Sequence, residues 1–297
     1  MDNLKNKRIL VTGGNGYLGS FLVDALKSLG CEIFILDQKQ VGNSNEFGVD
    51  ITIRNEVYNL LTKIKPHIVF HLAALLERGR DFSVHEKSLN VNYIGTMNLL
   101  LALKDIPEFE HFIFTSTSEV YGTNPSPFTE DMPPKPVSPY SMTKVFAEVA
   151  IQSVALNYGL NYTILRLFNF FGENMPPNFF IPQMLNAFKY EEVFKMTNGE
   201  QARDFLYVGD IINALLLTAT NPKSKQQIFN VCSAKSITLK DFVTLCHKSL
   251  QSTCRIDFGA LPYRENEIWN MVGDNTKIRQ TLGFEVQYDI STIIQKI

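Results

Sequence analysis

Residues 8–19 read RILVTGGNGYLG, and this stretch decides the fold. The first five residues form a short apolar run typical of a buried strand, and the segment after Gly19 has the pattern of a helix. Between them, Gly13, Gly16 and Gly19 allow a tight turn, a close approach of backbone N–H groups to a pyrophosphate, and close packing of the helix on the sheet. A strand, a glycine-rich turn and a helix in this order predict a dinucleotide-binding unit.

An acidic residue, Asp37, follows directly on the second predicted strand, EIFIL at 32–36. A carboxylate at this position can accept hydrogen bonds from both ribose hydroxyls and would repel a 2′-phosphate. The sequence therefore favours NAD over NADP as the cofactor. A solvated acid at the end of a strand is the alternative interpretation.

Further apolar runs rich in Ile, Val and Phe alternate with longer amphipathic segments. They predict strands at 67–72, 111–115, 162–168 and 228–231. Strands that alternate with helices imply a parallel sheet with right-handed crossovers. The expected fold class is therefore α/β, a Rossmann-type doubly wound parallel sheet with a smaller C-terminal substrate-binding lobe.

The alternation breaks after residue 170, where the chain becomes rich in Pro, Phe and Asn. We expect residues 1–170 to form the NAD-binding Rossmann domain and residues 206–231 to return to it. The segments 171–205 and 232–297 are expected to build the substrate-binding lobe.

Composition narrows the class of protein. The chain has 297 residues, 45% of them hydrophobic and 20% charged, which is typical of a globular enzyme rather than a disordered protein. A net charge of -2 predicts no general attraction to nucleic acid or to an anionic membrane. The four cysteines are scattered without metal-ligand spacing, and no apolar run has the length of a signal peptide or a membrane span. We expect a cytoplasmic protein without a metal site.

The segment SPYSMTK at 138–144 predicts the start of a helix, because Ser138 is a good N-cap and Pro139 suits the first helical position. Tyr140 and Lys144 are four residues apart and share one helix face. A phenol titrates near pH 10 and acts as a base only if its anion is stabilised, as a nearby ammonium and the helix N-terminus both do. Tyr140 could then exchange a proton with a carbinol, while Lys144 reaches the nicotinamide ribose. A solvated helix face is the alternative.

Hydroxyl side chains follow the predicted strand 111–115. In an open parallel sheet the C-terminal end of a central strand faces the ligand crevice, so Thr115 is expected beside the cofactor and Thr117 beside Tyr140. Thr117 could donate to a hydroxyl or ketone oxygen of the substrate. The alternative is a Ser/Thr-rich turn that satisfies its own backbone.

Taken together, the motifs resemble those of the extended short-chain dehydrogenase/reductase family, in particular its nucleotide-sugar epimerases, dehydratases, decarboxylases and 4-ketoreductases. The resemblance covers nearly the whole chain. It rests on TGGNGYLG (12–19), HLAA (71–74), NYIGTMNLL (92–100), TSEVYG (117–122), YSMTK (140–144), LRLFNFFG (165–172), RDFLYVGD (203–210) and PYRENE (262–267).

The resemblance implies specific cofactor contacts. Tyr17 and Leu18 would lie against the pyrophosphate, and Asp50 and Ile51 would hold the adenine. The remaining implied contacts are Leu72, Ala73, Ala74, Asn92 and Phe168.

The resemblance also implies a catalytic triad and a nucleotide-sugar substrate. The triad is Thr117, Tyr140 and Lys144. The residues implied to contact the substrate are Thr117, Glu119, Asn169, Arg203 and Arg264, and the two arginines would supply positive charge that the bulk composition lacks.

The shared opening step of such enzymes is removal of a sugar hydroxyl proton as hydride passes to NAD, giving a 4-keto sugar. Dehydratases usually carry an Asp-Glu pair after the catalytic threonine, whereas this chain has Ser118-Glu119. We expect an NAD-dependent nucleotide-sugar 4-epimerase, with a 4-keto-6-deoxysugar 4-reductase as the alternative. A dehydratase or decarboxylase ranks lower, followed by a reductase of carbonyls without a nucleotide and a non-catalytic NAD-sensing protein. The resemblance further implies a homodimer built on the helices at 86–104 and 140–158.

Overall fold

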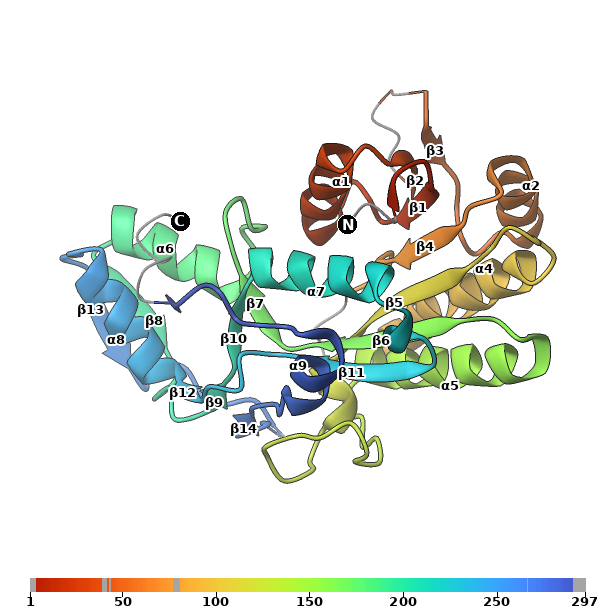
Figure 1. The fold of residues 1–297 in the computed structure, drawn as a ribbon. Helices are drawn as coiled ribbons and strands as arrows, with labels where there is room; N and C mark the ends of the chain where they lie inside the picture. Colours follow the sequence, from red (N-terminus) through yellow and green to blue (C-terminus); the bar gives the residue numbers. More distant parts are fainter. Residues whose placement is uncertain (1–3, 39–41, 43, 77–80, 266, 291–297) are drawn as a thin grey trace.

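A seven-stranded parallel sheet forms the centre of the molecule (Figure 1). The computed structural model describes residues 4–38, 42, 44–76, 81–265 and 267–290. In spatial order the strands are β11 (Gln227–Val231), β6 (Tyr162–Leu167), β5 (His111–Thr117), β4 (Ile68–His71), β1 (Arg8–Thr12), β2 (Glu32–Asp37) and β3 (Glu46–Gly48).

The strand order places a topological switch beside β1. The chain runs outward through β2 and β3 on one side of β1, then crosses to β4, β5, β6 and β11 on the other. In doubly wound sheets the ligand crevice lies at the C-terminal ends of the strands at this switch. Every strand expected from the sequence is present, and the α/β Rossmann-type fold is confirmed.

Helices cover both faces of the sheet. One apolar core joins it to α1 (Tyr17–Ser28), α7 (Val208–Thr220) and α9 (Thr276–Leu282). The other core joins it to α2 (Arg54–Ile64), α4 (Gly95–Leu103) and α5 (Pro139–Tyr158). The segment leading to α4 contains the 3₁₀ turn Phe82–Val84, α3 (His85–Leu89) and a π-helix at Asn90–Ile94.

Smaller elements form a third apolar core away from the large sheet, at the left in Figure 1. Short pairings join β10 to β7, β13 to β8, and β12 to β9 and β14. The elements are β7 (Asn169–Phe171), α6 (Phe180–Tyr190), β8 (Val193–Met196), β9 (Ala202–Arg203), β10 (Phe205–Tyr207), β12 (Ile237–Thr238), α8 (Leu239–Ser249), β13 (Arg255–Phe258) and β14 (Asn270–Met271). The two-lobe division given above stays a prediction.

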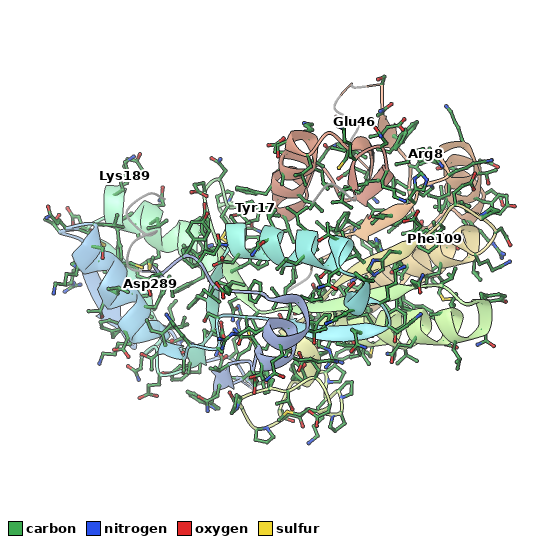
Figure 2. The ribbon with its side chains drawn as sticks, in the orientation of Figure 1. Arg8, Tyr17, Glu46, Phe109, Lys189 and Asp289 are labelled. Atoms are coloured by element: carbon green, nitrogen blue, oxygen red, sulfur yellow. The ribbon has the colours of Figure 1, made fainter. Side chains whose placement is uncertain are left out.

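Side chains fill the space between these layers (Figure 2). Tyr17, at the first position of α1, stacks on Phe170 of β7, with ring centroids 6.2 Å apart. The residue that opens the first helix of the large sheet therefore contacts the segment that leads into the smaller elements. Among the described residues, no helix has the length and apolar character needed to span a bilayer.

Candidate active site

The glycine-rich turn packs so closely that side chains are excluded from it. A Cβ on Gly13 would lie 2.8 Å from the Ala73 nitrogen, and one on Gly19 would lie 2.1 Å from the Gly13 oxygen. Gly13 also has a φ of 71°, which L side chains rarely adopt. The turn therefore brings the backbones of β1, α1 and the segment after β4 into direct contact.

The N-terminus of α1 opens at this turn. Its N-cap is Gly16, which offers no side-chain cap, so the first N–H groups of the helix keep their capacity to donate to an anion. Asp37 ends β2 beside the turn, and its Oδ2 accepts the Asn15 N–H at 3.2 Å. A cradle of backbone donors next to a carboxylate fits the pyrophosphate and ribose of a dinucleotide.

Tyr17 and Leu18 occupy the first turn of α1, which begins at Tyr17 and not, as the sequence predicts, after Gly19. The Tyr17 hydroxyl is buried without a hydrogen-bond partner in the described part of the chain, and burial together with nearby Glu173 raises its pKa above the ordinary value. Leu18 packs on the core under α1. The backbone N–H groups of these two residues belong to the first turn of α1, where they have no partner within the helix.

The expected adenine contacts lie after β3. Asp50 Oδ1 accepts the Thr52 N–H at 2.9 Å, which orders the turn. Ile51 is buried, and its carbonyl accepts a hydrogen bond from Asn98 Nδ2 at 2.9 Å. The side chain of Ile51 fills the space beside Gly95 of α4.

The expected lining of the cofactor channel, Leu72, Ala73 and Ala74, directly follows β4. The Leu72 N–H donates to the Thr12 carbonyl at 3.1 Å, and the Ala73 N–H donates to Thr12 Oγ1 at 3.2 Å. One residue further, the Asn92 side chain holds both the N–H and the carbonyl of Leu75 (2.7 and 3.1 Å). The segment is thus fixed by side chains at both ends.

Tyr140 and Lys144 lie in the first turns of α5 and are both buried. Lys144 Nζ donates to the Thr115 carbonyl at 2.8 Å and lies 6.0 Å from the centre of the Tyr140 ring. Burial lowers the pKa of Lys144 to about 7, while the Glu148 carboxylate opposes that shift. A buried ammonium beside a phenol strongly favours the phenolate form of that phenol.

Thr115 and Thr117 lie at the C-terminal end of β5, against which α5 packs. Thr115 Oγ1 donates to the His71 carbonyl at 3.2 Å, and Thr117 Oγ1 accepts the Glu119 N–H at 3.2 Å. The Thr117 hydroxyl hydrogen is not used by that contact. The structure supports the turn interpretation for Thr117, while its donation to a ligand stays a prediction.

Ser118 and Glu119 point to different neighbours. The Ser118 hydroxyl donates to the Met271 sulfur at 3.3 Å, and Glu119 Oε2 accepts the Ser138 hydroxyl at 3.3 Å. Glu119 therefore lies at the N-terminus of the helix that carries Tyr140, whereas Ser118 is directed towards β14.

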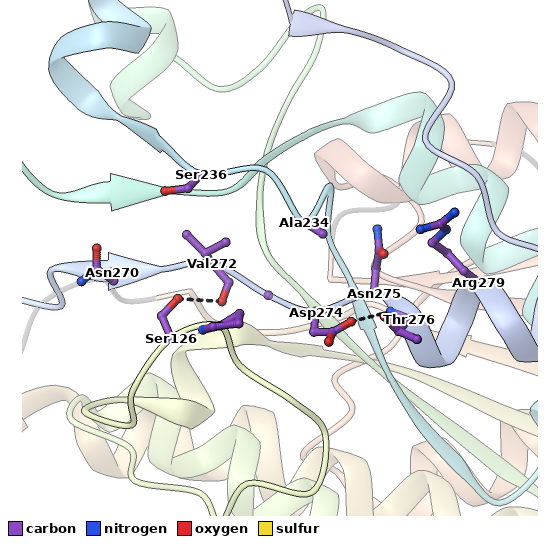
Figure 3. Close-up of a pocket in the computed structure, with 11 residues that line it drawn as sticks. Ser126, Ala234, Ser236, Asn270, Val272, Asp274, Asn275, Thr276 and Arg279 are labelled. Atoms are coloured by element: carbon purple, nitrogen blue, oxygen red, sulfur yellow. Dashed lines mark hydrogen bonds between the residues drawn. The ribbon is translucent and has the colours of Figure 1, made fainter.

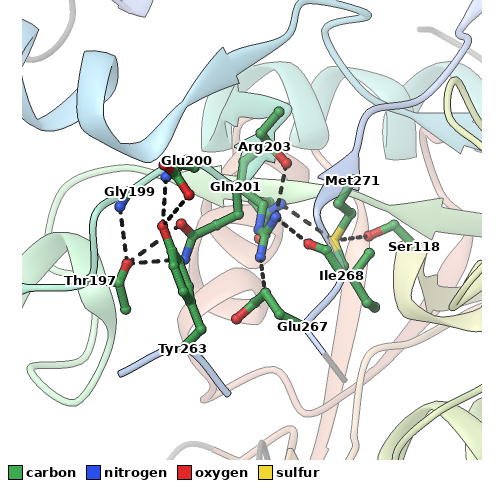
Figure 4. A network of polar contacts seen from close by, with 12 residues as sticks. Ser118, Thr197, Gly199, Glu200, Gln201, Arg203, Tyr263, Glu267, Ile268 and Met271 are labelled. Carbon is green, nitrogen blue, oxygen red and sulfur yellow. Dashed lines mark hydrogen bonds and ion pairs between the residues drawn. The ribbon is translucent and has the colours of Figure 1, made fainter. Parts of the chain in front are cut away.

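The residues implied to contact substrate phosphates lie on or between the smaller elements. Figure 4 shows Arg203 with its partners Glu267 and Ile268. Arg203 of β9 forms a partly buried ion pair with Glu267 at 2.7 Å and donates to the Ile268 carbonyl at 2.8 Å. Arg264 is exposed, and its charge lowers the pKa of Arg203 further below the value that burial sets. Asn169 of β7 donates to the Met271 sulfur at 3.6 Å. Positive charge is present as expected, but that of Arg203 is largely compensated by Glu267.

Phe168 lies between β6 and β7 and is buried in an apolar cluster with Tyr121 and Phe128, at ring distances of 6.4 and 6.3 Å. Its ring also fills the space beside Gly273. Any contact of Phe168 with a cofactor would therefore involve chiefly its backbone, because the residue is only 3% exposed.

A surface pocket of about 570 Å³ lies beside β14 and is lined by none of the expected site residues (Figure 3). Its lining includes Ser126, Asn270, Asp274 and Arg279. A smaller hollow of about 400 Å³ does adjoin the glycine turn, at Gly16 and Tyr17.

Two features of the site were missed by the sequence analysis. Glu267 neutralises Arg203, and the pair Glu148–Arg166 lies beside Ser116 of β5, with Glu148 accepting the Ser116 hydroxyl at 2.5 Å. The only local signal was Glu148, one further turn along the helix face that carries Tyr140 and Lys144. The described residues hold no group of His, Cys, Asp or Glu side chains suited to a metal.

A doubly wound sheet, a glycine turn with an adjacent acid, and a buried Tyr/Lys pair together define a dinucleotide-dependent redox enzyme. The sequence model of the NAD dependent epimerase/dehydratase family matches residues 9–232. The chain therefore belongs to that family, and NAD is its cofactor.

Individual relatives carry different activities. The chain is 29% identical to a UDP-glucose 4-epimerase of Rhizobium meliloti, over 98% of this chain and 96% of the relative. It is also 29% identical to a GDP-6-deoxy-D-talose 4-dehydrogenase of Aggregatibacter actinomycetemcomitans, over 95% and 93%. The solved structure of a UDP-glucose 4-epimerase with UDP-glucose from Thermotoga maritima matches with a TM-score of 0.88 and 28% identity, over 97% and 96%.

Proposed function

We propose that the chain is a nucleotide-sugar 4-epimerase that oxidises sugar C4 to a ketone and reduces it again from the other side. The observation that carries this proposal is the buried pair of Tyr140 and Lys144, with Lys144 anchored on the Thr115 carbonyl at 2.8 Å beside Thr117. The similarity to UDP-glucose 4-epimerases over nearly the full chain supports it.

In this proposal the N-terminal amides of α1 bind the cofactor's pyrophosphate, and Asp37 accepts its ribose hydroxyls. Asp50 and Ile51 hold the adenine, while the segment Leu72–Ala74 lines the channel towards the nicotinamide. When bound, NAD supplies an acceptor for hydride from sugar C4 and a donor for its return.

Tyr140 is the proposed acid/base group. As phenolate it accepts the proton of the sugar 4-hydroxyl, and as phenol it returns a proton when the ketone is reduced. The Lys144 ammonium stabilises the phenolate, and Thr117 donates a hydrogen bond to the reacting oxygen. Epimerisation needs no other proton donor, because the same proton is taken and given back.

Arg203 and Arg264 are proposed to bind the diphosphate of the substrate together with Asn169. Because Glu267 already neutralises Arg203, we assign most of the attraction for phosphate to the exposed Arg264. Glu119, next to the N-terminus of α5, is proposed to contact the sugar.

A homodimer is part of the proposal. The outer face of α5 exposes Phe146, Val149 and Leu156, the last with 88% of its surface accessible. Tyr93 of the preceding helical segment packs its ring on Phe146, with centroids 6.2 Å apart. An apolar stripe across two adjacent helices suits a two-fold interface between copies of the chain.

A 4-keto-sugar reductase is the second candidate. It is favoured by the similarity to a GDP-6-deoxy-D-talose 4-dehydrogenase. The chain is 29% identical to that enzyme, the same identity as to the UDP-glucose 4-epimerase of Rhizobium meliloti. A glucose-type dehydratase is disfavoured, because Ser118 replaces the aspartate expected of many dehydratases and its hydroxyl is directed towards Met271.

The fate of the cofactor separates the two candidates. The proposal expects purified protein to retain NAD and to interconvert UDP-glucose and UDP-galactose, or the GDP-sugar equivalents, without net consumption of NADH. Stoichiometric consumption of NADH with a nucleotide 4-keto sugar would support the reductase instead. A protein that binds no NAD, or that changes no nucleotide sugar, would contradict both.

A further inference from the structure

A chain of buried hydrogen bonds runs beneath the site and centres on His71, the last residue of β4. The Thr12 hydroxyl of β1 meets His71 Nδ1 at 2.6 Å, and His71 Nε2 meets the Thr96 hydroxyl of α4 at 2.9 Å. All three side chains are fully buried. The imidazole thus bridges the strand that leads into the glycine turn and the helix that follows the π-helix.

The neighbouring contacts fix the direction of every hydrogen bond. The Thr96 hydroxyl donates to the Asn92 carbonyl at 2.7 Å, so it can only accept from His71. His71 must therefore carry its hydrogen on Nε2, which leaves Nδ1 to accept the hydroxyl hydrogen of Thr12. The Thr12 oxygen in turn accepts the Ala73 N–H at 3.2 Å. In this arrangement the imidazole is neutral and both of its nitrogens are satisfied.

The chain continues from Asn92 to the helix of the Tyr/Lys pair. Asn92 Nδ2 donates to the Thr143 hydroxyl at 3.0 Å, and Thr143 donates to the Tyr140 carbonyl at 2.8 Å. Asn92 lies in the π-helix Asn90–Ile94, a distortion that is frequent at functional sites. Its side chain also holds both backbone groups of Leu75, at 2.7 and 3.1 Å.

We propose that His71, as the neutral tautomer with hydrogen on Nε2, is a positioning residue that connects the cofactor-lining segment to the helix of Tyr140 and Lys144. Through Thr12 it fixes Ala73, and through Thr96 and Asn92 it fixes Leu75 and Thr143. The segment between Ala73 and Leu75 is thereby held at both ends against α5. The catalytic part of this inference rests on the proposed function, whereas the cofactor-binding part requires only that the chain binds NAD.

The surroundings of His71 keep the imidazole neutral. The charged group that faces it is the Lys144 ammonium of α5, and Phe112 and Phe114 of β5 pack on its ring at 5.6 Å each. Burial and, secondarily, Lys144 lower the pKa of His71 to about 3. The chain of hydrogen bonds therefore stays intact over the pH range in which the enzyme would operate.

Two substitutions at Thr96 separate hydrogen bonding from packing. Thr96→Val keeps the shape of the side chain and removes the hydroxyl, whereas Thr96→Ser keeps the hydroxyl and removes a methyl group. The inference expects Thr96→Val to weaken NAD binding and to lower kcat by about ten-fold each, the factor that corresponds to the loss of one buried hydrogen bond. The KM for the nucleotide sugar should stay unchanged, and Thr96→Ser should behave like the wild type.

The opposite effects of the two Thr96 substitutions would overturn the inference. If Thr96→Val retains wild-type NAD affinity and kcat while Thr96→Ser loses them, the site is held by packing alone. Both variants are compared at a temperature at which circular dichroism shows them folded. If the wild type binds NAD but turns over no nucleotide sugar, the proposed function fails, and the NAD titrations still decide this inference.

A second measurement needs neither cofactor nor substrate. NMR of protein with isotope-labelled histidine reports which imidazole nitrogen carries hydrogen, and His71→Gln identifies the signal. The inference expects hydrogen on Nε2 alone between about pH 5 and 9, because one neutral tautomer satisfies both neighbours. Hydrogen on Nδ1, or an imidazolium in this range, would contradict it.

Discussion

The surroundings of Lys144 destabilise its positive charge. It is 2% exposed, its Nζ lies 4.4 Å from the Phe114 ring centre, and burial lowers its pKa to about 7. A buried ammonium is stabilised by any anion that forms beside it, and the Tyr140 phenol is the group that can become one. The same burial that destabilises the ammonium therefore makes its effect on Tyr140 large.

The roles of Tyr140 and Arg264 predict opposite kinetic effects. Tyr140→Phe removes only the hydroxyl, so turnover should fall by about 10² to 10⁴-fold while affinity for the nucleotide sugar barely changes. Arg264→Ala should weaken binding by about 1.5 to 3 kcal/mol, because it removes a charge-assisted contact with phosphate. Isothermal titration and steady-state rates on both variants measure the two effects. Near-full turnover of Tyr140→Phe would show that another group, with Glu119 the next candidate, transfers the proton.

The depressed pKa of Lys144 predicts a pH dependence of stability. Between the folded value of about 7 and the ordinary value of 10.5, the unfolded chain holds a proton on this amine and the folded chain does not. The unfolding free energy should therefore rise with pH in this window, by up to about 1.4 kcal/mol per pH unit from this group.

Lys144→Met is the matching variant, and urea unfolding of NAD-free protein at several pH values gives the measurement. The unfolding free energy of the wild type should increase relative to that of the variant as the pH rises from 7 to 10. A difference between the two proteins that does not change with pH would contradict the assigned pKa.

At the scale of elements, the start of α5 determines where Tyr140 lies. The Ser138 hydroxyl accepts the Ser141 N–H at 3.1 Å and the Ser141 hydroxyl accepts the Ser138 N–H at 3.1 Å, which forms a reciprocal cap. Pro139 occupies the first helical turn, as the sequence predicts. Tyr140 thus lies at the positive end of the helix dipole, which favours its anionic form.

The pair Glu148–Arg166 joins α5 to β6 directly beneath this site. Both side chains are less than 5% exposed, and they meet at 2.7 Å. Removal of one partner leaves a buried charge without compensation, so Glu148→Gln should lower the unfolding free energy by about 3 to 5 kcal/mol. Replacing both, as Glu148→Leu with Arg166→Met, should recover much of that loss. Chemical denaturation tests this, and a double variant as unstable as the sum of its single variants would refute it.

At the scale of the whole molecule, the exposed stripe on α5 predicts assembly. Light scattering at micromolar concentration should give the mass of a dimer. Val149→Glu with Leu156→Glu should shift it towards the monomer, because charges would be buried in an apolar interface. The matched control is Tyr190→Glu, which changes an exposed apolar residue of α6 away from this stripe. A wild-type monomer, or a dimer that persists in the double variant, would contradict the proposed interface.

The large sheet could be predicted because its strands are buried on both faces and therefore appear as unbroken apolar runs. The strand β3 was missed, because three residues, Glu46–Gly48, give no periodic signal. The glycine turn and the Tyr/Lys pair are local motifs and could be located from spacing alone. The pairing of Arg203 with Glu267 could not be predicted, because the partners are far apart in sequence. The sequence motifs showed two arginines without the carboxylate that compensates one of them.

The central claim, reversible hydride transfer at sugar C4 with Tyr140 as the acid/base group, is tested most directly by running the reaction in heavy water. An epimerase of this kind returns the same hydride to C4, so NMR of the product should show an inverted C4 that carries no deuterium. Tyr140→Phe, loaded with the same amount of NAD, should give product at least about a hundred-fold more slowly. Deuterium at C4 or C5 of the product, or equal rates for the two proteins, would contradict the account.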